Sequence, residues 1–308
     1  MNRALLAVLF VSLVAASGAR AQQADLRDYE AGFFVPHRGI IAHTYLRHVS
    51  ASGDTRDFSQ TLAAFRATYM LKFGNLAVVP FDVSLPVVDM TVFQANPDSP
   101  LAPKAALRAS GVGDLIYIPT VGFGLVQNAE TNTHTWFAFT PYVTLPTGRY
   151  DSDRFLNVGA NRWTVRPQLV VGQRFMKAFT AELMANVGFH GDNDEFLVPS
   201  ATGGAPAKLD MRQSPSLGGI VALGMDLSPT FFTGAAYHLD AAGRRTLDTP
   251  AGERELSPRQ TVQSLRLTMG IRLEKVSTLM FQFQPDIAAS EGVTKGQFVG
   301  VRFLHVIP

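Results

Sequence analysis

The chain has 308 residues, of which 46% are hydrophobic and 17% charged, and it contains 26 Gly and no Cys. This apolar content excludes a disordered chain, and the lack of Cys excludes a disulfide scaffold and thiolate chemistry. The formal net charge is +2, and the sequence has no basic stripe of the kind that binds nucleic acid. After the first sixteen residues, no apolar run approaches the roughly 20 residues of a membrane-spanning helix.

The first 21 residues have the pattern of a secretory signal peptide. Arg3 precedes the apolar run 4–16, and the small residues Ala19 and Ala21 flank Arg20 as they do at a cleavage site. We therefore expect the chain to be exported, with the mature protein beginning at Gln22. Residues 22–37 would form a short periplasmic segment before the folded domain, residues 38–308.

Beyond this signal, hydrophobic and polar residues alternate with a period of two, which indicates β-strands. In the clearest segment, 162–175, one face carries Val165, Leu169 and Val171, whereas the other carries Arg166 and Arg174. Aromatic rings stand at both ends of the apolar face, as in a strand that crosses lipid between two interfacial girdles. The predicted strands lie near 38–49, 62–73, 76–88, 114–126, 134–146, 162–175, 179–190, 214–227, 230–239, 261–273, 278–287 and 296–307.

The connections between these segments alternate between long and short. The long ones are 50–61, 89–113, 147–161, 191–213, 240–260 and 288–295; the short ones are 74–75, 127–133, 176–178, 228–229 and 274–277. Outer-membrane barrels have long extracellular loops, short periplasmic turns and an even number of strands. Because lipid offers no hydrogen-bond partner to the backbone, such a sheet must close. We predict an all-β fold, a transmembrane antiparallel β-barrel of about 12 strands, which residues 22–37 could plug.

The polar face of these strands should line the lumen, because an Arg that faces lipid costs about 2–4 kcal/mol at the midplane. The side chains assigned to the lumen are His43, Arg47, Arg66, Lys72, Asp82, Arg162, Arg166, Arg174, Glu182, Asn186, Arg266, Arg272 and Arg302. Their excess of basic groups has two interpretations. A ring of Arg favours anionic solutes, whereas a network of Arg with Glu and Asp would stiffen the wall and fill the lumen.

Aromatic residues near the strand ends are expected to anchor the barrel at the two membrane interfaces. These residues are Trp163, Phe175, Phe137 and Trp136. Trp and Tyr are enriched at membrane interfaces because their rings are amphipathic. In the fourth segment, Ile116 and Ile118 interrupt the otherwise polar face.

Two phrases of the chain are characteristic: TPYVTLPTGRYD, residues 140–151, and LNVGANRW, residues 156–163. Through them the chain resembles the outer-membrane transporter family linked to the meta-cleavage pathway of phenol degradation, over most of its mature length. The resemblance implies a β-barrel in the outer membrane of a Gram-negative bacterium that passes aromatic or otherwise hydrophobic small molecules. The chain departs from the usual barrel ending, since it ends in Ile307 and Pro308 where barrels commonly end in phenylalanine.

Together these features predict an outer-membrane channel for passive uptake of small hydrophobic or aromatic compounds. The expected partners are outer-membrane lipid and lipopolysaccharide, the solute and the barrel assembly machinery, with no nucleic acid, cofactor or metal. Enzymatic activity is not expected, because His48 and Ser50, the nearest catalytic pairing, lie in no hydrolase motif. Two alternatives stay open: a closed structural or adhesion-type barrel whose extracellular loops bind partners, and a soluble secreted β-sandwich.

Overall fold

The computed structural model describes the chain except residues 1–38, 53–55, 95–104, 200–203, 274–275 and 308. The signal peptide and the expected periplasmic segment 22–37 therefore lie outside the described residues. In the part of the chain that is described, no helix is long and apolar enough to cross a membrane. The strands are β1 (Gly39–Ser52), β2 (Arg56–Phe73), β3 (Leu76–Gln94), β4 (Ala105–Val112), β5 (Ile116–Tyr117), β6 (Thr120–Asn128), β7 (Thr133–Thr144), β8 (Thr164–Phe175), β9 (Phe179–His190), β10 (Asn193–Val198), β11 (Ala207–Gln213), β12 (Ser216–Asp226), β13 (Phe231–Ala242), β14 (Arg245–Thr249), β15 (Gly252–Ser257), β16 (Gln260–Leu273), β17 (Ser277–Ala289) and β18 (Gly296–Ile307).

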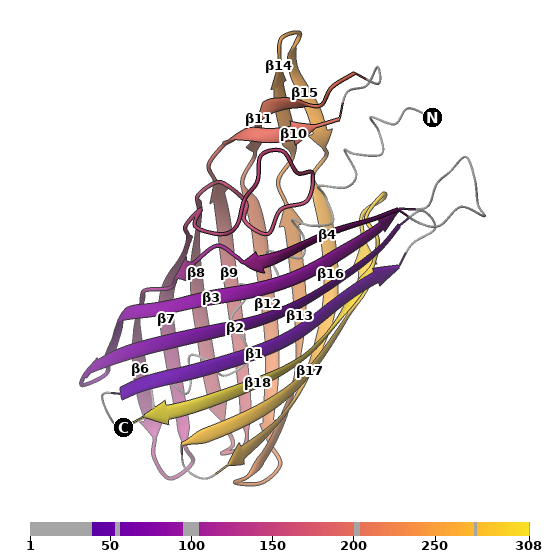
Figure 1. Ribbon diagram of the computed structural model, residues 1–308. Helices are drawn as coiled ribbons and strands as arrows, with labels where there is room; N and C mark the ends of the chain where they lie inside the picture. Colours follow the sequence, from indigo (N-terminus) through magenta and orange to yellow (C-terminus); the bar gives the residue numbers. More distant parts are fainter. Residues whose placement is uncertain (1–38, 53–55, 95–104, 200–203, 274–275, 308) are drawn as a thin grey trace.

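Fourteen of these strands form one antiparallel sheet that closes into a barrel (Figure 1). Closure occurs where the first strand, β1, pairs with both β2 and the last strand, β18. The strands β4, β5 and β6 each pair with β3 in turn and together take one position in the wall, so twelve strands go round the barrel. Closure lets the backbone find partners within the sheet where lipid offers none. The predicted antiparallel twelve-stranded barrel is confirmed.

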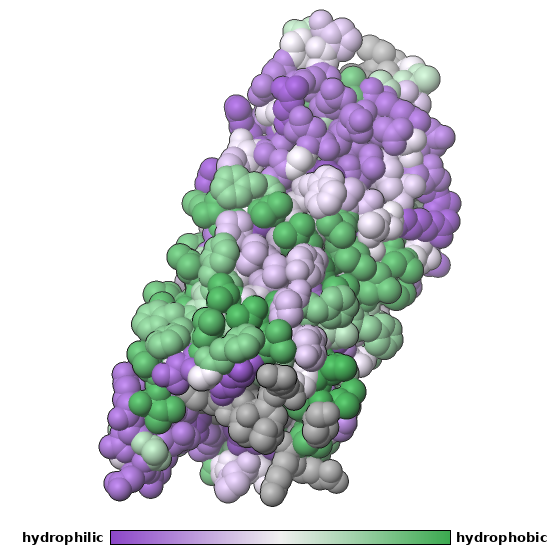
Figure 2. All heavy atoms as spheres, turned by 90° about the vertical axis from the view of Figure 1, so that its left-hand side faces the viewer, coloured by the Kyte–Doolittle hydropathy of each residue, from purple (hydrophilic) through white to green (hydrophobic). Residues whose placement is uncertain are grey.

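The outer face of the barrel is apolar because every second side chain of each strand points outward. In β8, Val165 is 40% exposed and Leu169 62% exposed, whereas Arg166 and Gln168 between them are buried. On the side that Figure 2 shows, hydrophobic residues form a band around the middle of the molecule, with hydrophilic residues above and below it. This is the surface that a bilayer requires of a spanning barrel.

The connections are shorter on one end of the barrel than on the other, as expected, but two of the long ones are shorter than predicted. Residues 50–61 do not form a long loop, since β1 continues to Ser52 and β2 begins at Arg56. The strands extend because Phe58 and Gln60 are still buried against the barrel interior. The connection 89–113 is likewise shorter than predicted, because β3 runs to Gln94 and β4 begins at Ala105.

The fourth barrel position is broken where its sequence is least suited to a strand. Gly113 and Pro119 lie in the two gaps that separate β4, β5 and β6, and proline has no N–H to donate to a sheet. Ile116 and Ile118, which interrupt the polar pattern, are buried inside the barrel against Tyr142 of β7. At the break, a small apolar cluster therefore lies between the part of the sheet in which β3 pairs with β4 and the part in which β3 pairs with β6.

A second sheet stands above the barrel, formed by β10, β11, β14 and β15 (Figure 1). Its strands come from the connections 191–213 and 240–260, which the sequence predicted only as loops. A small core of Met211, Leu247 and Leu256 holds the strands together. This sheet brings residues from two long connections over one side of the barrel mouth.

Candidate functional site

The side chains assigned to the lumen are all at least half-buried, and all except Arg162, which lies in the loop before β8, belong to strands of the barrel. Of that set, Arg66, Lys72 and Arg272 are half-buried. The others are buried: His43, Arg47, Asp82, Arg162, Arg166, Arg174, Glu182, Asn186, Arg266 and Arg302. Their burial fits inward placement, and contact between them and a transported solute stays a prediction.

On the β1–β3 side, these inward groups form an ion-pair and hydrogen-bond network. Arg66 donates from Nε and Nη2 to both oxygens of Asp82, at 2.7 and 2.5 Å. Arg302 donates from Nη2 to Nδ1 of His43 at 2.7 Å, and its guanidinium lies 5.0 Å from the centre of the Tyr45 ring. This part of the interior is a connected wall of polar side chains, which favours the stiffening network over an open ring of charges.

A second network closes the end of the barrel that carries the short turns. Asp226 accepts hydrogen bonds from both Arg174 and Arg272, the latter at 2.5 Å. Arg272 also lies 5.0 Å from the centre of the Phe232 ring. A single carboxylate thus pairs with two guanidiniums at the rim, where three strands end.

We expect Asp226→Asn to destabilise the barrel by about 2 kcal/mol, because the two guanidiniums that share this partly buried carboxylate lose a charged hydrogen-bond acceptor. The matched control is Asp153→Asn, which breaks a 3.0 Å ion pair with Lys208 whose carboxylate is 82% exposed. The control should unfold like the wild type, since exposed ion pairs contribute little. Urea titration of the refolded protein, read from the gel shift between folded and unfolded barrel, measures both. Equal midpoints for wild type and Asp226→Asn would contradict the expectation.

Between the two networks, an apolar cluster spans the lumen. We call it the Trp136 cluster; it comprises Met70, Ala77, Val79, Trp136, Ala138, Val170, Met184, Ile220, Ala222 and Ala236. Its residues come from seven strands around the barrel, and Trp136 is completely buried among them. At this level of the barrel, buried apolar side chains therefore meet inside the lumen.

This placement corrects the prediction that Trp136 anchors the barrel in the membrane interface. Trp136 lies on the inward face of β7, opposite Gly172 of β8. The other predicted anchors lie outside or near the rim: Trp163 is 54% and Phe137 46% exposed, and Phe175 is half-buried. Their anchoring role stays a prediction.

Above the Trp136 cluster, toward the extracellular sheet, the interior opens into a cavity of about 300 Å³. Four arginines and two aspartates line it: Arg154, Arg162, Arg166, Arg245, Asp114 and Asp240. Apolar side chains cover another part of its surface, among them Leu156, Phe155 and Phe196. The cavity therefore combines an excess of positive charge with an apolar wall, and its size is at the lower end of that of small-molecule sites.

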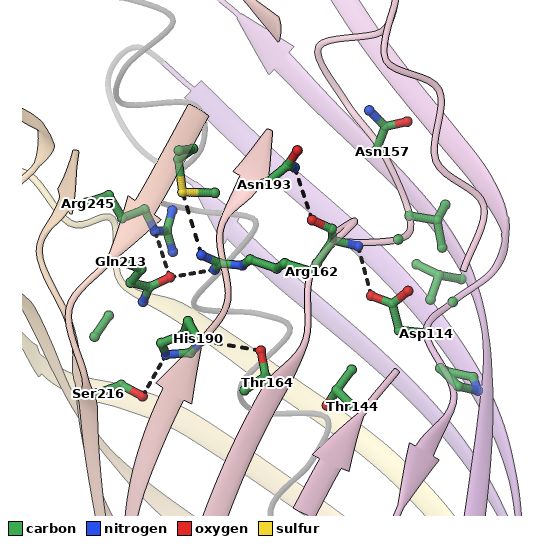
Figure 3. Close-up of a pocket in the computed structure, with 18 of the residues that line it drawn as sticks. Asp114, Thr144, Asn157, Arg162, Thr164, His190, Asn193, Gln213, Ser216 and Arg245 are labelled. Atoms are coloured by element: carbon green, nitrogen blue, oxygen red, sulfur yellow. Dashed lines mark hydrogen bonds between the residues drawn. The ribbon is translucent and has the colours of Figure 1, made fainter. Parts of the chain in front are cut away.

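The polar part of this cavity is organised by Gln213, at the end of β11 (Figure 3). The side-chain oxygen of Gln213 accepts hydrogen bonds from Nη2 of Arg162 at 2.5 Å and from Nε of Arg245 at 3.3 Å. Beside them, His190 is held between the hydroxyls of Thr164, at 3.3 Å, and Ser216, at 3.1 Å. Two buried guanidiniums from different loops thus converge on one neutral acceptor.

The loop that carries Arg162 is fixed by a carboxylate in the broken wall strand. Asp114 accepts the backbone N–H of Gly148 and of Ala160, both at 2.8 Å. Asn193 adds a hydrogen bond from its amide to the carbonyl of Ala160 at 3.1 Å. The end of the first phrase that carries the family resemblance, residues 145–151, and the second phrase, residues 156–163, therefore belong to one folded loop over the barrel mouth, which holds Arg162 in place.

Sequence reasoning found Arg162 and missed its partners. Asp114 is the first residue of the predicted strand 114–126 but carries no pattern that distinguishes it from a surface acid. Gln213 and Arg245 lie at the ends of β11 and β14, whose residues looked like loop. Only the pairing of Gln213 with Arg245 across these two strands brings them to the cavity.

Comparison with known proteins agrees with the fold. A family model described as "MetA-pathway of phenol degradation" matches residues 35–303. The crystal structure of the COG4313 outer membrane channel from Pseudomonas putida F1 is similar with a TM-score of 0.75 and 21% identity, over 92% of this chain and 100% of that one. The transport unit of the autotransporter AIDA-I from Escherichia coli gives 0.55 at 8% identity, over all of both chains. The TodX monoaromatic hydrocarbon channel, as its deltaS2 mutant, gives 0.50 at 8% identity over 89% and 91%. No curated protein matches the sequence.

Proposed function

We propose that this chain is an outer-membrane port for passive uptake of small hydrophobic or aromatic compounds. The chain belongs to the family of the MetA-pathway of phenol degradation, whose model matches residues 35–303. The observation that carries the proposal is the cavity on the extracellular side of a barrel whose outer surface is apolar. A compound of modest size can be held there between polar groups and an apolar wall. The family description, which names phenol degradation, supports an aromatic solute.

The interior argues against a wide, water-filled pore. The porins with wide aqueous channels have sixteen to eighteen strands, whereas this barrel has twelve and carries the buried Trp136 cluster inside it. A solute that moves along the axis must displace or pass this cluster. Transport would then be selective and slow compared with a general porin, and driven only by the solute gradient.

The same apolar cluster favours one alternative, a closed barrel that acts as a structural or adhesive scaffold. In that case the extracellular sheet β10–β11–β14–β15 would provide the functional surface. The similar solved structures are two channels and the transport unit of an autotransporter. We assign no catalytic role to any residue of this chain. Lipopolysaccharide and the barrel assembly machinery are proposed partners of the folded protein.

Uptake by whole cells separates port from scaffold, because the lipopolysaccharide leaflet slows the entry of hydrophobic compounds that cross plain lipid freely. We expect cells that express the protein to take up radiolabelled naphthalene several-fold faster than cells with an empty vector. The amount of folded barrel in the outer membrane is checked by its heat-dependent shift on a gel. Equal uptake despite folded barrel would leave the scaffold as the function.

A further inference from the structure

The cavity at the barrel mouth contains a buried arginine, Arg162, whose hydrogen bonds go to uncharged groups. Arg162 is 9% exposed, and its guanidinium donates to two neutral acceptors, the side-chain oxygen of Gln213 and the sulfur of Met211. In the described part of the chain it forms no ion pair. One of the two acids in the cavity, Asp114, already accepts two backbone N–H groups.

Burying a guanidinium is costly unless an anion pairs with it, and Arg162 shares its acceptor, Gln213, with a second guanidinium, that of Arg245. Burial and the nearby charge of Arg162 lower the pKa of Arg245 to about 9. Burial also lowers the pKa of Arg162 to about 10, although the charges of Asp192 and Asp114 oppose this. Both arginines lie outside the membrane-spanning strands, where a solute arriving from outside would meet them first.

Part of the cavity lining is apolar and therefore restricts the kind of anion that fits. Leu156 is buried, and Phe155 and Phe196 also line the cavity, Phe196 packed against the small core that contains Met211. An inorganic anion would leave this wall in contact with water. A carboxylate attached to an apolar body would place its charge on the arginines and its body on the wall. The planar fork of Arg suits a carboxylate in particular.

We propose that the cavity is a binding site for small apolar monocarboxylates such as benzoate, held at Arg162 and Arg245 with the ring against Leu156 and Phe155. The inference rests on the proposed function, because it specifies the class of solute that the port selects at its entrance. Gln213 would place the two guanidiniums side by side by accepting from both. A neutral phenol or hydrocarbon would use the apolar wall alone.

Binding is measured by calorimetry on the full chain in lipid nanodiscs, with benzoate and with benzyl alcohol as the uncharged probe of the same ring. We expect the wild type to bind benzoate at least about tenfold more tightly than benzyl alcohol, since hydrogen bonds between charged groups are the stronger ones. Arg162→Gln should weaken benzoate about tenfold or more and leave benzyl alcohol unchanged. The matched control is Arg254→Gln, on the exposed part of β15, which should bind both probes like the wild type.

Gln213→Glu supplies a second variant in case Arg162→Gln does not fold. It keeps both arginines and the shape of the side chain but introduces an internal carboxylate between them. We expect a stably folded barrel that has lost its preference for benzoate over benzyl alcohol. Equal binding of the two probes by the wild type, or unchanged benzoate binding in Gln213→Glu, would overturn the proposed anion site.

The outcome is independent of the transport experiment. Naphthalene uptake without selective benzoate binding would leave the port and reject the anion site. Selective benzoate binding without any uptake of naphthalene would leave the site and reject the port.

Discussion

Trp136→Ala should raise the single-channel conductance of the barrel several-fold. Trp136 is completely buried at the centre of the Trp136 cluster, which otherwise consists of smaller or more flexible residues such as Ala138, Ala222 and Met184. Removing the indole leaves a hole that the neighbouring alanines cannot fill. The same change should lower the stability of the barrel by about 3–5 kcal/mol, as replacing a buried Trp by Ala does elsewhere.

Planar-bilayer recordings measure this effect, and Trp163→Ala is the matched control. Trp163 is 54% exposed and lies on the outer surface, so its removal should leave the conductance unchanged. If Trp136→Ala conducts like the wild type, the cluster is not the constriction of an axial route. A solute would then have to leave the barrel by another path, or the scaffold alternative would be favoured.

The sequence predicted the membrane-facing part of the fold well because lipid imposes a strict pattern there. In β8 and β9 the outward residues are apolar with the exception of Gln173, so alternation marks both the strand and its orientation. The strand count followed from counting such segments. The twelve predicted segments each correspond to one position in the barrel wall.

Prediction failed where the strands leave the bilayer. Residues 56–61, 89–94 and 105–112 belong to strands of the barrel sheet, and the second sheet uses strands of only 5–7 residues. On the extracellular side water contacts the outer face, and both faces of a strand can carry polar residues. The alternation that marks a strand in lipid is then lost, so these segments looked like loops.

The candidate site was only partly predictable for a related reason. Arg162 belonged to the inward face of a clear strand pattern and was found. Arg245 and Gln213 reach the cavity through the pairing of β11 with β14, which no local pattern encodes. For Trp136, alternation along the strand correctly places the side chain inward. The general preference of Trp for membrane interfaces, by contrast, predicts the wrong position for it.

Gly172→Leu should prevent the barrel from folding, because the Trp136 ring occupies the space into which a side chain at position 172 would point. The two residues are directly opposite each other in the β7–β8 pair. A Cβ built at Gly172 would overlap the indole of Trp136, and a leucine adds three further carbons. Overpacking by even a few methylenes commonly costs about 1–3 kcal/mol, and here the ring has no free space to move into.

The double variant Trp136→Ala, Gly172→Leu tests this explanation, because the leucine can then occupy the volume that the indole has left. We expect it to fold, with a conductance below that of Trp136→Ala alone, since the lumen is partly refilled. Gly219→Leu controls for leucine in a barrel strand, because Gly219 has open space around its Cβ position and only the carbonyl of Met184 within 4 Å, at 3.9 Å. Refolding yield and conductance measure both expectations. If the double variant fails to fold while Gly219→Leu folds, the loss in Gly172→Leu does not arise from its overlap with Trp136, and the packing that we assign to the closed lumen is wrong.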